Sequence, residues 1–327
     1  MENTQDIILR VEHLKKYFDA GAHVFRRDKD QIKAVDDVSF KIRRGTTFAL
    51  VGESGCGKST IARLLLRLIT ATGGKAFFED KDLFELPPKD MREVRRDIQM
   101  IFQDPYSSLN PRWPVHKIIA EPLETHGIGT PAERKKLVEE MLDTVGLNAE
   151  AGLKYPHEFS GGQRQRVGIA RALITNPKFI ICDEPISALD VSIQAQIINL
   201  LRELQQKYQL TYLFITHDLR IVNFLCDDTA VMYLGKLVET GPTLDIFRDP
   251  LHPYTQALFS AIPIPDPLYE KQQIPLEGDV PSPLNPPSGC RFHTRCPHAM
   301  PICAEKEPEL CEIAPGHFCA CHLHKKE

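Results

Sequence analysis

The sequence predicts an α/β fold with a mainly parallel core sheet, followed by a small module rich in proline and cysteine. Short apolar runs alternate with helical patterns along most of the chain, as they do in α/β domains. Fifteen of the 25 prolines lie from Pro242 onward, where they exclude long helices and central strands. With 42% hydrophobic and 26% charged residues, the 327-residue chain can bury an ordinary globular core.

Four apolar runs are expected to form buried strands, because near-continuous hydrophobicity is typical of strands covered on both faces. They comprise residues 48–52, 179–185, 211–217 and 229–235. Helical spacing is found in stretches between them. The predicted helices cover residues 58–69, 131–146, 161–175 and 191–208.

Charge and hydropathy exclude several classes of partner. The chain carries 40 Lys and Arg against 44 Asp and Glu, a net charge of −4, so no basic field favours nucleic acid or anionic lipid. No apolar stretch approaches the roughly 18–20 residues that cross a bilayer. The first ten residues, MENTQDIILR, lack the basic and apolar regions of a signal peptide. We therefore expect a cytosolic protein that does not bind nucleic acid.

A phosphate-binding loop is predicted directly after the first of these strands. Residues 52–59 read GESGCGKS, a full match to the pattern G-x-x-x-x-G-K-[ST]. Gly55 and Gly57 let successive N–H groups point inward, and the helix that follows adds its positive N-terminal end. Lys58 is expected to neutralise the β- and γ-phosphates and Ser59 to ligate Mg²⁺. The predicted nucleotide-binding residues here are Gly52, Glu53, Ser54, Gly55, Cys56, Gly57, Lys58, Ser59 and Thr60.

An acidic pair ends the second predicted strand. Asp183 and Glu184 follow the apolar run 179–182, at the strand end where α/β sheets place their ligands. Asp183 is expected to hold Mg²⁺ through water, and Glu184 to act on the attacking water as base or orienter. Alone, an acidic pair after a strand is more often a helix cap. Likewise, the glycine-rich segment 52–59 alone could be a turn that binds no ligand. Together the two motifs indicate a catalytic nucleotide site.

A second anion site is predicted at residues 160–163, which read SGGQ and precede a run of strong helix formers. The Ser160 hydroxyl and the N–H groups of Gly161 and Gly162 would lie at a helix N-terminus, which favours negative charge. A flexible linker is the alternative, which the following helix disfavours. Completed by Gln163 and combined with the two motifs above, SGGQ resembles the signature of ABC-type ATPases.

The resemblance to ABC-type ATPases covers roughly residues 6–260 and implies roles for further residues. Gln103, in MIFQDP, matches the glutamine that contacts Mg²⁺ or water. His217 matches the histidine on the γ-phosphate, and Asp190, in SALD, matches the D-loop aspartate. The implied Mg²⁺ ligands are Ser59, Gln103 and Asp183, and the implied catalytic residues are Glu184, His217 and Gln103.

The same resemblance implies the adenine contact and the layout of the ATPase domain. Tyr17, in LKKYF, matches the aromatic residue that stacks on adenine, and the following segment offers His23 or Phe25 instead. The implied fold is a P-loop ATPase domain with an antiparallel β subdomain and a helical insertion at about residues 85–158.

The resemblance also implies partners. In ABC ATPases, ATP is pinched between the phosphate loop of one subunit and the SGGQ signature of another. We expect a heterodimer with a related ATPase, with a homodimer as the alternative. Two transmembrane permease subunits would dock near Gln103, and a periplasmic or extracellular substrate-binding protein would act through them. The chain would then lie peripherally on the cytoplasmic face of the membrane.

Two further motifs resemble those of oligopeptide and dipeptide importer ATPases, a group that also contains nickel and glutathione importers. They are DPLHPYT at residues 249–255 and QDPYSSLNPR at residues 103–112. The implied domains are an ABC-type domain at 6–248 and a C-terminal extension at 249–327. The expected function is ATP hydrolysis that powers peptide uptake. The alternatives are import of nickel or glutathione, and a soluble ABC ATPase of DNA repair or translation.

Six of the nine cysteines lie within the last 38 residues, which in a reducing compartment suggests metal binding before disulfides. Their wide spacing differs from that of zinc ribbons and suits a [4Fe–4S] cluster, with zinc or free thiols as alternatives. Some peptide importer ATPases carry such a cluster, and matching their pattern selects four ligands. These are Cys290, Cys296, Cys303 and Cys321, with Cys319 or Cys311 as an alternative fourth ligand.

Overall fold

The structure is a computed structural model that describes residues 6–19, 31–262, 274–276 and 278–324. The chain separates into two compact units. The first unit consists of the described parts of Met1–Ile8, Arg43–Thr46 and Glu85–Ile215. The second unit consists of the described parts of Leu9–Ile42, Thr47–Phe84 and Thr216–Glu327. The predicted domain boundary at 248/249 stays a prediction.

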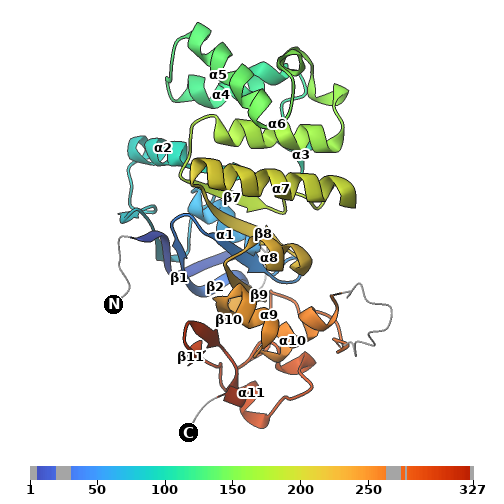
Figure 1. The fold of residues 1–327 in the computed structure, drawn as a ribbon. Helices are drawn as coiled ribbons and strands as arrows, with labels where there is room; N and C mark the ends of the chain where they lie inside the picture. Colours follow the sequence, from blue (N-terminus) through green and yellow to red (C-terminus); the bar gives the residue numbers. More distant parts are fainter. Residues whose placement is uncertain (1–5, 20–30, 263–273, 277, 325–327) are drawn as a thin grey trace, which may run out of the picture. The chain divides into compact units, whose positions relative to one another are not determined.

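The first unit combines three parallel strands with a group of helices. Strand β7 (Phe179–Asp183) pairs in parallel with β6 (Ile98–Ile101) and β8 (Thr211–Thr216). Figure 1 shows α4, α5 and α6 gathered together in green. The helices of this unit are α2 (Pro88–Asp97), α3 (Pro105–Ser108), α4 (Val115–Thr125), α5 (Pro131–Thr144), α6 (Gly161–Leu173) and α7 (Val191–Tyr208), with short 3₁₀ turns η2 (Ala149–Leu153) and η3 (Pro156–Glu158).

Local sequence explains where these helices begin. Thr130 and Glu133 form a reciprocal capping box at the start of α5, and Pro131 occupies the first helical position. Ser160 and Gln163 form a second capping box at α6. In each case the cap satisfies backbone N–H groups that the helix itself leaves without partners.

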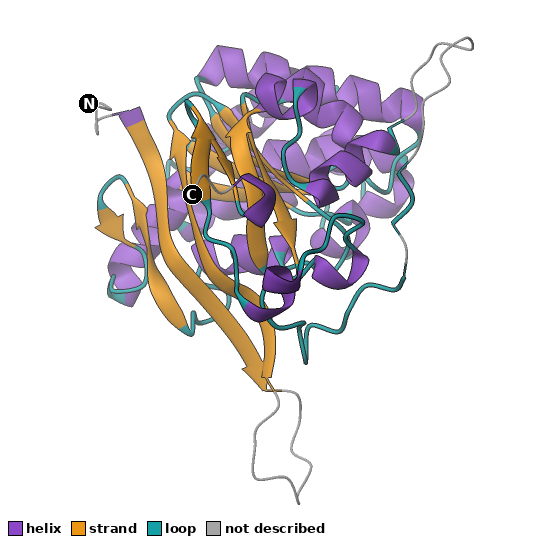
Figure 2. Cartoon of the chain, turned by 90° about the horizontal axis from the view of Figure 1, so that it is seen from below, coloured by secondary structure: helices purple, strands orange, loops and turns teal. Residues whose placement is uncertain are grey.

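The second unit contains two groups of strands. In one, β9 (Asp228–Tyr233) pairs in parallel with β3 (Thr47–Val51) and antiparallel with β10 (Lys236–Pro242). The other has the order β2 (Gln31–Arg43), β1 (Ile7–Asp19), β4 (Gly73–Phe78) and β5 (Lys81–Asp82). Figure 2 shows β1 as the long strand that starts at the N-terminal end. The α-helices are α1 (Lys58–Leu65), α8 (Leu219–Leu225), α9 (Thr243–Arg248), α10 (Pro253–Ser260) and α11 (Pro301–Glu305).

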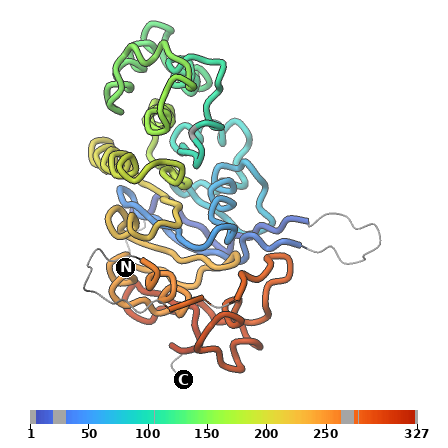
Figure 3. Tube along the Cα trace, turned by 90° about the vertical axis from the view of Figure 1, so that its right-hand side faces the viewer, coloured from blue at the N-terminus to red at the C-terminus, as the bar shows by residue number. Residues whose placement is uncertain are grey.

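The C-terminal residues share the sheet and core of this second unit. Strand β12 (His317–Cys319) pairs with both β10 and β11 (Cys311–Ala314). Two 3₁₀ turns, η4 (His293–Arg295) and η5 (His322–His324), complete the segment, drawn in red beside α9 and α10 in Figure 3. The buried rings of Tyr233, Tyr254 and Phe292 contact one another, with centroids 4.6–5.4 Å apart.

The α/β class is confirmed, and each predicted strand and helix is observed with small shifts. Helix α1 ends at Leu65 rather than near residue 69, because Arg67 adopts a left-handed backbone with φ of 50°. The segment 85–158 is mainly helical but also contains β6. None of the helices in the described ranges is long and apolar enough to cross a membrane.

Candidate nucleotide site

The phosphate-binding loop lies in the second unit, between β3 and α1. Lys58 is buried, and its ammonium donates hydrogen bonds to the backbone oxygens of Gly52 at 2.8 Å and Glu53 at 2.9 Å. The Sγ atom of Cys56 lies 3.6 Å from the same ammonium. The charge of Lys58 is therefore held inside its own loop, where phosphate oxygens could take over these hydrogen bonds.

Close backbone approach explains two glycines of this loop. A Cβ atom on Gly52 would lie 2.1 Å from the backbone oxygen of Met232, and one on Gly57 would lie 2.1 Å from that of Ala34. Their φ angles, 149° and 113°, also lie in the region that L side chains rarely adopt. Gly55 has open space around it, so only its φ of 80° favours glycine.

Glu53, the second residue of the loop, is held by the C-terminal part of the chain. Its backbone N–H donates a hydrogen bond to the Tyr254 hydroxyl oxygen at 3.0 Å. Its carboxylate accepts hydrogen bonds from the Arg295 guanidinium, the shortest N–O distance being 3.0 Å. Neither contact could be predicted from the sequence, because the partners lie 201 and 242 residues from Glu53 and no motif links them to the loop.

In the first unit, Gln103 and Glu184 come together from the ends of β6 and β7. The Gln103 side-chain amide donates a hydrogen bond to Oε2 of Glu184 at 2.9 Å. Glu184 follows the buried Asp183, and its backbone N–H donates to the oxygen of Ile215 at 2.9 Å. Its φ is 47°, a conformation that is uncommon for a glutamate and clusters at active sites. The backbone and Gln103 therefore fix the orientation of this carboxylate.

The SGGQ segment forms the N-terminus of α6 in the first unit. The Ser160 hydroxyl oxygen accepts a hydrogen bond from the Gln163 N–H at 3.4 Å, and the Gln163 side-chain oxygen accepts one from the Ser160 N–H at 3.0 Å. Ser160, Gly161 and Gln163 are exposed. Gly162 is buried, and a Cβ atom there would lie 2.5 Å from Cγ2 of Ile193. The helix start is thus open to solvent, and packing on α7 requires the second glycine.

His217 and Asp190 both lie where strands give way to helices. His217 is exposed and directly follows β8. The next residue, Asp218, caps α8 by accepting a hydrogen bond from the Arg220 N–H. Asp190 is exposed and is the N-cap residue of α7, although its side chain accepts no capping hydrogen bond. Both side chains are therefore accessible from solvent.

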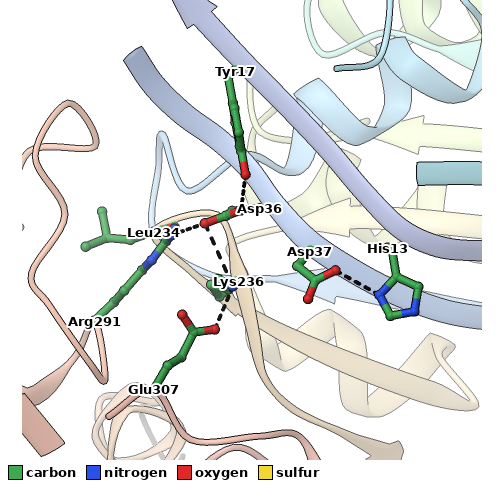
Figure 4. Close-up of polar contacts among 8 residues, drawn as sticks. All are labelled: His13, Tyr17, Asp36, Asp37, Leu234, Lys236, Arg291 and Glu307. Carbon is green, nitrogen blue, oxygen red and sulfur yellow. Dashed lines mark hydrogen bonds and ion pairs between the residues drawn. The ribbon is translucent and has the colours of Figure 1, made fainter. Parts of the chain in front are cut away.

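Tyr17 lies near the end of β1 and is held by its hydroxyl group (Figure 4). This hydroxyl donates a hydrogen bond to the carboxylate of Asp36, which also accepts one from the Arg291 guanidinium. Burial and the hydrogen bond with Asp36 raise the pKa of Tyr17 above its usual range. The alternative adenine contacts, His23 and Phe25, lie outside the described residues.

Asp36 is the centre of a charged cluster. The Lys236 ammonium lies 3.8 Å from its carboxylate and 2.6 Å from that of Glu307. Burial alone would raise the pKa of Asp36, but the hydrogen bond from Tyr17 and the charges of Lys236 and Arg291 hold it below its usual range. The C-terminal segment therefore supplies charges that surround the residue holding Tyr17.

The thiols of Cys296, Cys303 and Cys321 lie close enough to Cys290 to affect its pKa. Burial raises the pKa of the Cys290 thiol to about 11, and the three other thiols add to the rise. In the described parts of the chain, however, no group of three or more His, Cys, Asp and Glu side chains is arranged to hold a metal ion. The predicted ligand set is therefore not assembled as a metal site.

The two remaining C-terminal cysteines face each other across neighbouring strands. Cys311 of β11 and Cys319 of β12 are register partners. Cys311 is exposed and Cys319 is buried. Burial and the nearby Glu239 raise the pKa of Cys319 above its usual range.

Comparisons with known proteins place these motifs in a family. The family model for ABC transporters matches residues 35–187, and that for the C-terminal region of oligopeptide/dipeptide transporters matches residues 238–303. The chain is 55% identical to the putative oligopeptide transport ATP-binding protein YkfD of Bacillus subtilis, covering 97% of this chain and 96% of that protein. It is 53% identical to the oligopeptide transport ATP-binding protein AppF of the same organism, covering 98% of each.

The chain belongs to the oligopeptide/dipeptide ABC transporter ATP-binding family. The solved structures that resemble this chain also include ABC transporter ATP-binding proteins. The ABC transporter component cbiO1 of Clostridium perfringens matches with a TM-score of 0.64 and 29% identity, covering 75% of this chain and 92% of that one. A dimeric cassette, MJ0796, in a post-hydrolysis state bound to ADP and Pi matches with a TM-score of 0.63 and 27% identity, covering 72% and 98%. This member of the family is an ABC-type ATPase, and ATP is its nucleotide.

Proposed function

We propose that the chain is the ATP-hydrolysing subunit of an importer that carries di- and oligopeptides across the cytoplasmic membrane. The main support for peptides as the transported substrate is the match of residues 238–303 to the C-terminal region of oligopeptide/dipeptide transporters. The names of the two Bacillus subtilis relatives support it. This C-terminal match disfavours a soluble ABC ATPase of DNA repair or translation. Import of nickel or glutathione is the alternative, and the transport experiment below distinguishes it from peptide import.

The residues of the phosphate-binding loop are assigned to the triphosphate. The backbone N–H groups around Gly55 and Gly57 and the ammonium of Lys58 would bind the phosphate oxygens. Ser59, Asp183 and Gln103 offer the hydroxyl, carboxylate and amide oxygens that suit Mg²⁺. When bound, Mg²⁺ neutralises charge on the phosphate oxygens.

Glu184 is assigned as the base or orienter for water. The support is its fixed orientation, with Gln103 donating to Oε2 at 2.9 Å and a constrained backbone at φ of 47°. In the proposed step the water oxygen bonds to the γ-phosphorus, the bond to the bridging oxygen of ADP breaks, and Glu184 takes the water proton. His217 would hydrogen-bond the γ-phosphate.

A second ATPase subunit is proposed to complete each site. The exposed N-terminus of α6 supports this, because Ser160 and Gly161 offer an anion site that faces solvent. The dimeric cassette among the structural relatives supports it further. We propose a heterodimer with a related ATPase, with Asp190 near the dimer contact. Purification of the transporter with a single ATPase species would contradict the heterodimer and indicate a homodimer.

Two transmembrane permease subunits are proposed to hold this subunit on the cytoplasmic face of the membrane. The segment around Gln103 supports docking, because Phe102 and Tyr106, on either side of this glutamine in the sequence, have exposed aromatic side chains. A substrate-binding protein outside the membrane would deliver peptide to the permeases.

The transport proposal is tested in vesicles that contain the permeases, the second ATPase and the substrate-binding protein. Uptake of a labelled tripeptide should require ATP and should stop in the Glu184→Gln variant. Glu139→Gln, which changes an exposed glutamate of α5, is the matched control and should leave uptake unchanged. Uptake of nickel or glutathione without uptake of peptides would contradict the peptide class.

We also propose that the C-terminal module holds a [4Fe–4S] cluster, with zinc as the alternative. The proposed ligands are Cys290, Cys296, Cys303 and Cys321. The hydrogen bond from the Cys290 N–H to the Cys303 backbone oxygen, 2.8 Å long, supports the proposal, because it holds two of the four cysteines beside each other. A cluster would stabilise a segment with few large apolar residues. No step of ATP hydrolysis passes through it.

Metal analysis of anaerobically purified protein tests the cluster. About four iron per chain and broad absorption near 400 nm are expected. Cys296→Ser should lose the iron, while Cys226→Ser, outside the C-terminal module, should keep it. Comparing Cys321→Ser, Cys319→Ser and Cys311→Ser identifies the fourth ligand. Colourless protein with about one zinc would replace the cluster by zinc, and protein with neither metal would contradict both.

A further inference from the structure

The C-terminal segment reaches back to the phosphate-binding loop at one residue, Glu53. Arg295 ends η4 and is buried. Its Nη1 atom donates to both carboxylate oxygens of Glu53, at 3.0 and 3.4 Å, and its Nη2 atom donates to one of them at 3.4 Å. A guanidinium that donates from two nitrogens fixes both the place and the orientation of a carboxylate.

Tyr254 holds the same residue by its backbone. The Tyr254 hydroxyl oxygen accepts the Glu53 N–H at 3.0 Å, so the protein itself uses this donor. Tyr254 is fully buried, and its ring contacts Tyr233 and Phe292. A rigid aromatic cluster therefore fixes the first turn of the loop from outside.

The charge of Glu53 makes these contacts important for nucleotide binding. A carboxylate within a loop that receives a triphosphate would repel its negative charges. The side chain of Glu53 is 25% exposed and that of Arg295 is 6% exposed, so solvent screens the pair only in part. Arg295 is thus the cation that balances the carboxylate of the loop.

We propose that Arg295 and Tyr254 are positioning residues for the phosphate-binding loop, which hold Glu53 by its carboxylate and its N–H and keep its charge from opposing the triphosphate. This inference rests on the proposed role of residues 52–60 in binding ATP. It gives the C-terminal region a direct part in nucleotide affinity through contacts inside a single chain.

The test measures Mg·ATP affinity of the full-length chain by calorimetry. Arg295→Gln removes the balancing charge and should weaken binding about tenfold, because the carboxylate then repels the phosphates and solvent screens this repulsion only in part. Arg295→Lys keeps the positive charge, so its affinity for Mg·ATP should fall less than that of Arg295→Gln. The double variant Arg295→Gln/Glu53→Gln removes the unbalanced carboxylate as well, and it should bind several-fold more tightly than Arg295→Gln alone.

That last comparison separates charge balance from simple structural support. If Arg295 only supports the fold, the double variant should bind ATP no better than Arg295→Gln, and this result would overturn the proposal. In the assembled transporter, Arg295→Gln should raise KM for ATP while kcat stays within about twofold, since the interaction acts on binding rather than on the chemical step.

Three further variants complete the test. If Arg295→Gln fails to fold, Tyr254→Phe keeps the ring and removes only the hydroxyl, and it should weaken ATP binding several-fold; unchanged binding would count against the proposal. Lys306→Ala removes an exposed charge from the same segment and should bind ATP normally. Lys58→Ala tests the underlying function separately. If it binds ATP normally, the loop assignment fails, whereas loss in Lys58→Ala with no loss in Arg295→Gln overturns only this inference.

Discussion

The hydroxyl of Tyr17 donates a hydrogen bond to the carboxylate of Asp36, which the Arg291 guanidinium and the Lys236 ammonium also hold. This relationship joins strand β1 to the C-terminal segment within the second unit. It also means that the position of Tyr17 depends on its hydroxyl, while stacking on adenine would depend only on its ring. Variants at Tyr17 can therefore separate the two.

Tyr17→Ala should weaken ATP binding by about tenfold, because stacking of an aromatic ring on a base contributes about 1–3 kcal/mol. Tyr17→Phe keeps the ring and should stay within about threefold of the wild type. Calorimetry measures the affinity for Mg·ATP and for Mg·tripolyphosphate, which separates the contribution of the adenine base from that of the phosphates. Tripolyphosphate has no base, so its affinity should not change in either variant. Equal losses for both ligands would argue against an adenine contact.

Glu184→Gln should leave ATP binding nearly intact and lower steady-state hydrolysis by about 10² or more, because a general base typically contributes 10²–10⁴-fold. Phosphate release by the assembled transporter is the measurement. Gln103→Ala should have a smaller effect on the rate, since it removes the amide that orients Glu184 and leaves the carboxylate in place. A Glu184→Gln transporter that releases phosphate at the wild-type rate would rule out the assignment.

Ser160 has both a structural role as helix cap and a proposed role at the ATP of the partner subunit. Ser160→Asp keeps a good N-cap residue while adding a negative charge, so the free energy of unfolding should change by less than about 0.5 kcal/mol. Hydrolysis by the assembled transporter should nevertheless fall at least tenfold, because the charge would oppose phosphate. Ser160→Ala should cost about 1 kcal/mol in urea unfolding. If Ser160→Asp hydrolyses ATP normally, Ser160 is a cap alone.

The sequence predicts those parts of the fold whose cause is local. The apolar run before Gly52 and the capping residues before α6 contain within a few residues the physical reason for their structure. Strand β6 was included in a predicted helical insertion, because its four residues are too short a run to distinguish from buried helix.

The sequence cannot predict contacts that depend on the tertiary fold. Gln103 and Glu184 were each assigned from a motif, but their hydrogen bond follows from the parallel pairing of β6 and β7. Tyr254 lies in the DPLHPYT motif, but no motif linked Tyr254 or Arg295 to Glu53, because what matters is their distance from Glu53 in space. The wide cysteine spacing likewise allowed a metal site without fixing where each thiol would lie.

Stability should also depend on pH through His252, which caps α10. Its Nδ1 atom accepts the Tyr254 N–H at 3.0 Å, and burial lowers its pKa to about 4. Glu239 opposes this lowering and His324 adds to it. In the unfolded chain its pKa is about 6.5, so the unfolded state binds more protons between these values. The contribution to stability is then complete above pH 6.5 and is lost as the pH falls toward 4, amounting to about 3 kcal/mol.

Urea unfolding of the wild type and His252→Asn between pH 8 and pH 4 measures this contribution. Asparagine is also a good N-cap but does not titrate, so the variant should be less stable than the wild type at pH 8, where it loses the ring packed 5.7 Å from that of Phe292. As the pH falls below 6.5 the wild type alone should lose the histidine contribution, because the unfolded chain takes up a proton at His252 that the buried ring of the folded state does not. The stability difference should therefore shrink by a few kcal/mol between pH 7 and pH 4. Parallel pH curves for the two proteins would show that the pKa of His252 is the same in the folded and unfolded states, which would contradict the prediction.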